Sequence, residues 1–168
     1  VDAAAGVPLP HRETGTWTLW NNVEKTLDKQ PAVAVRALAR AEGDRLEAAR
    51  AAAWDAAAAR GAGGDAAAAA TTTIAGATGN CAKFVNGTFD RVPGERKPGG
   101  APVYRKRGDG RMWWLFLAPS DNRWYVGRTE RKDARKDRGW ACTVAAVAAG
   151  TLPHEAPAGG WKESNGKK

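Results

Sequence analysis

Few residues of this sequence are of types that do chemistry by themselves, and their spacing assembles no site. The only histidines, His11 and His154, each lie in a proline-rich stretch, without the His or Cys neighbours of a zinc site. The only serines, Ser120 and Ser164, fall in a predicted turn and a predicted tail. Because no nucleophile, base and orienting group come together, we predict a protein that is not an enzyme and that holds no metal and no cofactor.

The two cysteines, Cys81 and Cys142, lie near the two ends of an aromatic-rich region and leave two alternatives open. A disulfide between them could clamp that region, or both could remain thiols, since two cysteines make no disulfide framework. Residues 86–88 also fit a glycosylation sequon, which matters only in a secreted chain. A secreted location is therefore one alternative.

The aromatic residues gather between Val103 and Gly127, in a stretch that two turn-forming sites interrupt. Residues 107–110 and 119–122 are rich in Gly, Asp, Asn and Pro, and they divide the stretch into three predicted antiparallel strands. The middle strand carries apolar side chains on both faces, which predicts the central strand of a small sheet. We predict that the core aromatic residues are Tyr104, Trp113, Trp114, Phe116, Trp124, Trp140 and Trp161.

Shorter elements are predicted beside these strands. Residues 83–89 suggest a hairpin centred on an Asn-Gly turn. Residues 130–138 predict a short helix, with Thr129 as its N-cap and Gly139 just after its end. Alternating apolar residues from position 140 indicate one more strand or a turn of helix through Val147.

The first half of the chain is poor in large apolar residues, so it is predicted to depend on other surfaces. Residues 1–31 are predicted to form an extended docking arm, in which Trp17, Leu19 and Trp20 insert into a partner or, as the alternative, into a groove of the chain's own domain. Residues 32–60 are Ala-rich and predict a helix that is marginal by itself. Its thin apolar stripe consists of Val35, Leu38, Leu46, Ala49 and Ala53.

These patterns predict an α+β chain, in which the arm and the Ala-rich helix precede a small antiparallel β-sheet module with one short helix. Residues 61–79 are low in complexity and predict a linker. The module spans residues 80–161, and residues 162–168 form a tail. No stretch reaches the roughly 18 apolar residues of a membrane span, so any membrane association is predicted to be peripheral.

The net charge of +8 belongs to one region of the chain. Residues 91–138 hold fourteen Lys or Arg and six Asp or Glu, and the rest of the chain is balanced. Such a local excess favours an anionic partner, which we predict to be an acidic face of another protein. A solvated basic surface without a partner is the alternative. The predicted docking residues in this region are Arg105, Lys106, Arg107, Arg131, Lys132 and Arg135.

The second half of the chain resembles a Trp-rich module that recurs in proteins of algal protists such as haptophytes and dinoflagellates. The shared pattern is Val-Tyr-Arg-Lys at 103–106, Trp-Leu-Phe at 114–116, Trp-Tyr-Val at 124–126 and Leu-Pro-His-Glu-Ala-Pro at 152–157. The resemblance covers about residues 80–161 and implies no catalytic residue. That family continues past the closing Trp with a further short strand, so the last sheet edge is expected to be open or completed by a partner. The resemblance also implies an algal source and, through it, a thylakoid-associated location in a plastid.

These features favour a structural linker subunit that docks on components of a larger assembly. The resemblance suggests a plastid photosystem-antenna complex as that assembly. A carbohydrate-binding module is the first alternative, because exposed Trp and Tyr rings can stack on sugars. A nucleic-acid-binding module that uses the basic aromatic region is the second, although no known motif supports it.

Overall fold

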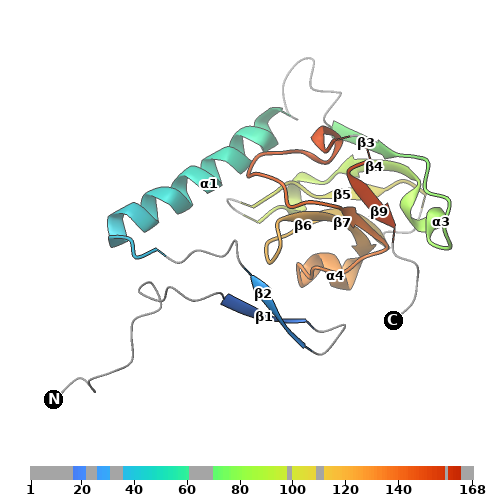
Figure 1. The fold of residues 1–168 in the computed structure, drawn as a ribbon. Coiled ribbons are helices and arrows are strands. Elements are labelled where there is room, and N and C mark those ends of the chain that lie inside the picture. Colours follow the sequence, from blue (N-terminus) through green and yellow to red (C-terminus); the bar gives the residue numbers. More distant parts are fainter. Residues whose placement is uncertain are drawn as a thin grey trace. The chain divides into compact units, whose positions relative to one another are not determined.

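The structure, a computed structural model, describes residues 17–21, 26–30, 36–60, 70–97, 100–108, 112–157 and 159–163, the first two segments by their backbone only. The chain divides into two compact units, Val1–Arg45 and Leu46–Lys168. The fold is α+β, as predicted, with a two-stranded and a seven-stranded antiparallel sheet (Figure 1). None of the helices in the described segments combines the length and the apolar character needed to cross a membrane.

The first unit contains the two-stranded sheet. Strands β1 (Trp17–Asn21) and β2 (Thr26–Gln30) pair antiparallel over five residues each. The prediction of an extended arm over residues 1–31 is therefore wrong for these two strands, and the remainder of that range lies outside the described residues. The Trp, Leu and Thr residues of the strands favour extended backbone. The predicted docking residues include Trp17, Leu19 and Trp20, and their side chains also lie outside the described part of the chain.

The second unit is built on the seven-stranded sheet, in which each strand pairs antiparallel with the next along the chain. Such a meander keeps sequential strands adjacent. The strands are β3 (Thr71–Ile74), β4 (Gly87–Arg91), β5 (Tyr104–Lys106), β6 (Trp113–Ala118), β7 (Arg123–Arg128), β8 (Ala141–Thr143) and β9 (Trp161–Glu163).

Strand β6 is the middle strand of this sheet and is buried on both faces, as its apolar pattern predicts. Leu115 and Leu117 belong to a first core, and Trp114 and Phe116 belong to a second core on the opposite face. The predicted core positions of Tyr104, Trp113, Trp114, Phe116 and Trp124 are confirmed, since none is more than 6% exposed. The other two predicted core residues, Trp140 and Trp161, are half-buried and pack at the margin of the first core.

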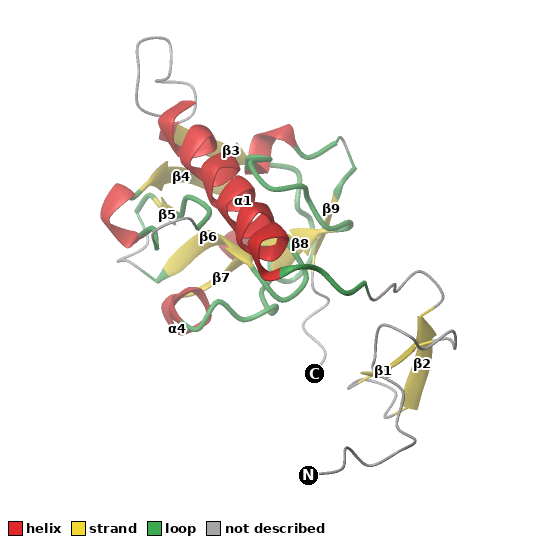
Figure 2. Ribbon diagram, turned by 90° about the vertical axis from the view of Figure 1, so that its left-hand side faces the viewer, coloured by secondary structure: helices red, strands yellow, loops and turns green. Residues whose placement is uncertain are grey.

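The Ala-rich helix α1 (Arg40–Arg60) contributes to the first core, but it begins later than the predicted residue 32. It turns Trp54, Ala57 and Ala58 inward, a spacing that places all three on one helix face. Figure 2 shows this part of the helix lying across the sheet. The predicted stripe is wrong, because Leu46 is 46% exposed and the largest side chain of the helix, Trp54, was left out of it.

Residues 71–74 form the edge strand β3, so the prediction of a linker over residues 61–79 is wrong for this segment. Three threonines and an isoleucine follow one another there, and β-branched side chains favour extended backbone. The module therefore begins before residue 80. It also ends later than predicted, because Lys162 and Glu163 belong to β9 rather than to a tail.

Residues 82–85 form a single helical turn, α3 (Ala82–Val85), where the first strand of a hairpin was predicted. That prediction is wrong, because β4 takes β3 as its partner. Asn86, the first residue of the sequon, holds the loop before the turn. Its Oδ1 accepts a hydrogen bond from the Ala77 N–H at 3.0 Å, and its Nδ2 donates to the Ala77 carbonyl oxygen at 2.8 Å.

Helix α4 (Thr129–Asp133) packs against β6 and β7, and it is shorter than the predicted helix over residues 130–138. The chain leaves the helix through Arg135, whose φ of 48° lies in the left-handed region. The prediction that this helix ends just before Gly139 is therefore wrong. Gly139 lies against β7, where a Cβ atom would stand 2.3 Å from the Val126 carbonyl oxygen.

Candidate functional site

Two of the basic residues predicted to bind a partner are engaged within the unit. Arg107 forms a two-pronged ion pair with Asp90, with both N–O distances at 2.7 Å. The hydrogen bond from Arg107 is the main cause that lowers the pKa of the Asp90 carboxyl group. Lys106 donates from Nζ to the Lys83 carbonyl oxygen at 2.6 Å. These cations connect β4, β5 and α3, and Arg105, which precedes them in β5, is half-buried.

Lys132 is buried, so its prediction as a docking residue is wrong. It is 3% exposed and forms ion pairs with Glu95 and, at 2.8 Å, with Asp133. Its Nζ also lies 4.2 Å from the centre of the Trp114 ring. Burial alone would lower the pKa of Lys132, but hydrogen bonds to Asp133 and Glu95 outweigh burial and raise it. The ammonium group therefore ties α4 to the loop at Glu95 over the second core.

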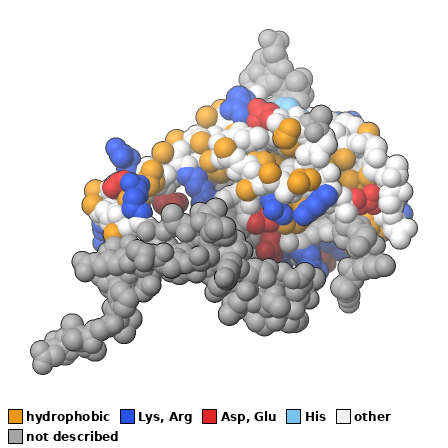
Figure 3. Space-filling view, in the orientation of Figure 1, with side chains coloured by type: hydrophobic (Ala, Val, Ile, Leu, Met, Phe, Trp, Pro, Cys, Tyr) orange, Lys and Arg blue, Asp and Glu red, His pale blue; other side chains and the backbone are white. Residues whose placement is uncertain are grey.

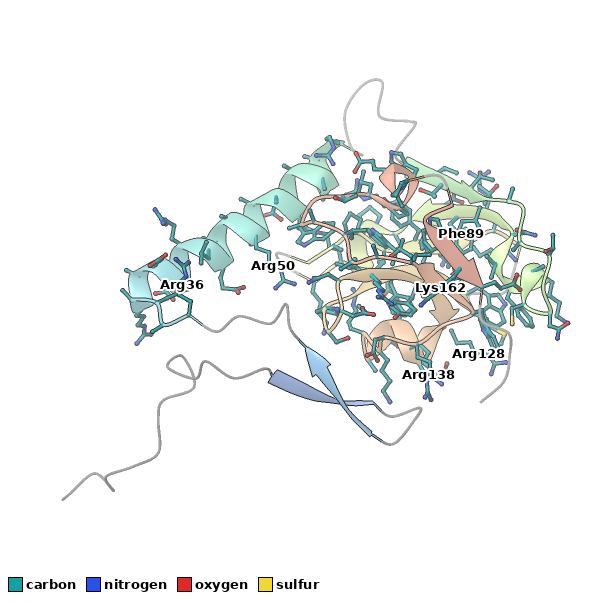
Figure 4. All side chains as sticks on the ribbon, in the orientation of Figure 1. Arg36, Arg50, Phe89, Arg128, Arg138 and Lys162 are labelled. Atoms are coloured by element: carbon teal, nitrogen blue, oxygen red, sulfur yellow. The ribbon has the colours of Figure 1, made fainter. Side chains whose placement is uncertain are left out.

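Several other basic side chains of this region lie in or next to α4. Figure 4 shows Arg128 and Arg138 directed outward at the α4 end of the unit. Arg131 and Arg135, both predicted docking residues, are half-buried in the same segment. On the face of the described residues shown in Figure 3, Lys and Arg lie in separate groups, with Asp and Glu nearby.

Arg135 reaches a hollow of about 560 Å³ beside α1, which we call the helix groove. The groove is lined by Trp54, by the cations Arg50, Lys97 and Arg135, and by one carboxylate, Glu47. Burial is the main cause that lowers the pKa of Arg135, while nearby carboxylates oppose it. The prediction from sequence missed Arg50 and Lys97, because they come from distant segments that no local pattern connects.

A second hollow of about 530 Å³, which we call the edge groove, lies between the first and last strands of the sheet. One wall consists of residues 72–78, and the other comes from residues between Pro153 and Glu163. The half-buried Trp161 and the imidazole of His154 are part of the second wall. No sequence signal pointed to this groove.

In the described part of the chain, His154 does not belong to a group that could hold a metal ion. The neighbouring Glu155 is engaged elsewhere, because it accepts a hydrogen bond from the Leu152 N–H at 2.6 Å and pairs with Arg60 at 3.4 Å. Among the residues that the structure describes, no group of three or more His, Cys, Asp or Glu is placed to hold a metal ion.

The two cysteines are buried thiols that lie on opposite faces of the sheet. Cys81 belongs to the first core and Cys142 to the second, so the disulfide alternative is wrong for this fold. Burial is the main cause that raises the pKa of each thiol. A raised pKa leaves little thiolate, the nucleophilic form of cysteine.

Both thiols are expected to resist modification while the protein is folded. With Ellman's reagent at about pH 8, we expect no rapidly reacting thiol in the native protein, because burial suppresses both access and ionisation. After unfolding in guanidinium chloride, the two thiols of the chain should react at once. A rapid native reaction, or thiols that appear only after reduction, would contradict this assignment.

Comparison with other proteins adds no candidate function. No protein-family model, no curated protein and no solved structure matches the chain.

Proposed function

We propose that this chain is a non-catalytic linker subunit that joins components of a larger protein assembly. The observation that carries the proposal is the division into two compact units. In its described residues, the first unit consists of the two-stranded sheet and the beginning of α1. A two-stranded sheet is marginally stable by itself in water. Its first strand contains Trp-Thr-Leu-Trp, and indole rings are frequent anchors of protein interfaces.

The second unit supports the same function. It buries the rings of Trp113, Trp114 and Trp124, so these rings do not offer a stacking surface to a sugar or a base. It presents instead the helix groove, with the cations Arg50 and Lys97 among its lining residues. An acidic surface of another protein would complement these cations. The algal resemblance makes a plastid photosynthetic assembly the first place to look for that protein.

The proposal is tested by removing the first unit's sheet without touching the second. A chain that lacks residues 1–35 keeps α1 and all seven strands of the large sheet. We expect it to retain the thermal unfolding of the second unit and to lose incorporation into the native assembly. The measurement is the migration of the tagged chain in native gel electrophoresis of extracts from its source cells.

Point variants separate the indoles from the rest of the strand. The double variant Trp17→Ala/Trp20→Ala should also stay out of the assembly, because it lacks the proposed anchors. The control Thr18→Ala/Lys29→Ala alters one cross-strand pair of the same sheet and should assemble normally. If the truncated chain migrates with the assembly as fully as the intact chain, the proposed role of the first unit is wrong.

A further inference from the structure

The lining of the edge groove shows that it runs along strand edges rather than over a sheet face. Successive side chains of a strand point to opposite faces, so a hollow on one face is lined by every second residue. The edge groove is instead lined on two sides by consecutive residues, 72–78 and 161–163, and between them by Val85, Ala141 and residues of the segment from Pro153 to Gly159. The backbone of both segments therefore borders the hollow.

These two segments carry the edges of the seven-stranded sheet. Within the part of the chain that the structure describes, β3 and β9 each pair with a strand on one side, β3 with β4 and β9 with β8. An edge strand presents main-chain N–H and C=O groups that can pair with a further strand. The edge groove therefore places two sets of such groups opposite one another.

One end of the groove is bridged by a side chain instead of a strand. The Glu163 carboxylate of β9 accepts hydrogen bonds from the Gly79 N–H at 3.0 Å and the Cys81 N–H at 2.8 Å. It reaches across to the segment that follows β3, and it supplies the acceptors that a neighbouring strand would supply. This contact fixes the spacing of the two walls at that end.

The groove also contains a buried polar atom without a partner. Thr72 is 5% exposed, and its hydroxyl oxygen makes no hydrogen bond to the described residues. Buried hydroxyl groups are normally paired, because an unpaired one keeps the full cost of losing water. The apolar residues Ile74, Val85 and Trp161 line the same hollow. Together they make a small pocket that is apolar except for one hydrogen-bonding group.

We propose that the edge groove binds an extended segment of a partner protein, which adds a strand between β3 and β9. Main-chain hydrogen bonds to the edges would give affinity, as in other cases of strand addition. A small apolar side chain with an adjacent polar group would fit the pocket at Ile74 and bond the Thr72 hydroxyl. A single strand between the two walls could pair with both edges, which the edge of another sheet could not do. This site goes beyond the linker role and does not depend on the first unit.

The test uses the full chain and a phage library of random peptides of about twelve residues. An extended peptide of that length, at roughly 3.3 Å per residue, is longer than the wall formed by the seven residues 72–78. A selected peptide should slow hydrogen exchange in residues 72–78 and 161–163. Thr72→Val should weaken its binding about tenfold, through the loss of one hydrogen bond in a desolvated site. The same variant should raise the melting temperature of the free protein, because it removes the unpaired hydroxyl.

Two controls make the result specific. Thr71→Val makes the same change in the same strand at a residue that does not line the groove, and it should leave peptide binding unaltered. The variant Trp17→Ala/Trp20→Ala should bind the peptide normally, which separates this site from the proposed role of the first unit. The proposal is overturned if no peptide is enriched, if Thr72→Val binds as tightly as the native chain, or if protection maps elsewhere. Faster exchange of residues 72–78 after deletion of residues 164–168 would also overturn it, by showing that the chain's own end fills the groove.

Discussion

Replacing Trp54 by alanine is expected to lower the free energy of unfolding by about 4 kcal/mol. Trp54 is the largest side chain that α1 contributes to the first core, and it is 3% exposed. Its ring meets that of Trp124 edge to face, with centroids 6.2 Å apart at an interplanar angle of 84°. Truncation removes this contact and leaves a cavity that neighbouring side chains fill only in part. Denaturant unfolding followed by far-ultraviolet circular dichroism measures the loss.

The matched control for this prediction is Leu46→Ala in the same helix. Leu46 is 46% exposed, so its truncation should change stability by no more than about 0.5 kcal/mol. Equal losses for the two variants would mean that α1 is not held on the sheet by Trp54. A loss confined to Trp54→Ala would establish the helix as part of the core.

Replacing Gly139 by alanine is expected to destabilise the second unit by about 3 kcal/mol. The added methyl group would stand 2.3 Å from the Val126 carbonyl oxygen and 3.3 Å from the ring of Tyr125. The first neighbour is backbone and cannot rotate away. It also accepts the Trp140 N–H hydrogen bond at 2.7 Å, which the displaced chain would weaken. Thermal unfolding would report the change.

Gly94→Ala is the control for this steric prediction. A Cβ atom at Gly94 has no neighbour within 4 Å, so the exchange should be close to neutral. If Gly139→Ala is as stable as Gly94→Ala, the segment after α4 is free to move away from β7. In that case the close approach of the two segments would not be required for folding.

The sequence by itself determined the centre of the second unit. The apolar pattern of residues 113–118 specified a strand buried on both faces, and the turn at 119–122 set its pairing with β7. Both signals are local, because alternation and turn residues act over a few positions. Five of the seven predicted core aromatic residues are buried for the same reason.

The prediction of the flanking elements failed where the residues that stabilise an element lie far from it in the sequence. Residues 71–74 favour extended backbone but lie in a low-complexity segment, and they become a strand through pairing with β4. Lys132 lies in a charged segment, and such a segment predicts side chains exposed to solvent. Its burial depends on Glu95, 37 residues away. In both cases the local pattern did not decide the outcome, because the stabilising contact comes from another part of the fold.

The tertiary structure alone decided both grooves. The helix groove exists because Trp54 draws α1 onto the sheet, which brings Arg50 close to Lys97 and Arg135. The edge groove exists because β3 and β9 approach each other, and the Glu163 side chain reaches the Cys81 backbone 82 residues away. The sequence predicted strands through the periodicity of their side chains. Where two edges meet depends instead on the accumulated twist of all the strands between them, which no single stretch of residues encodes.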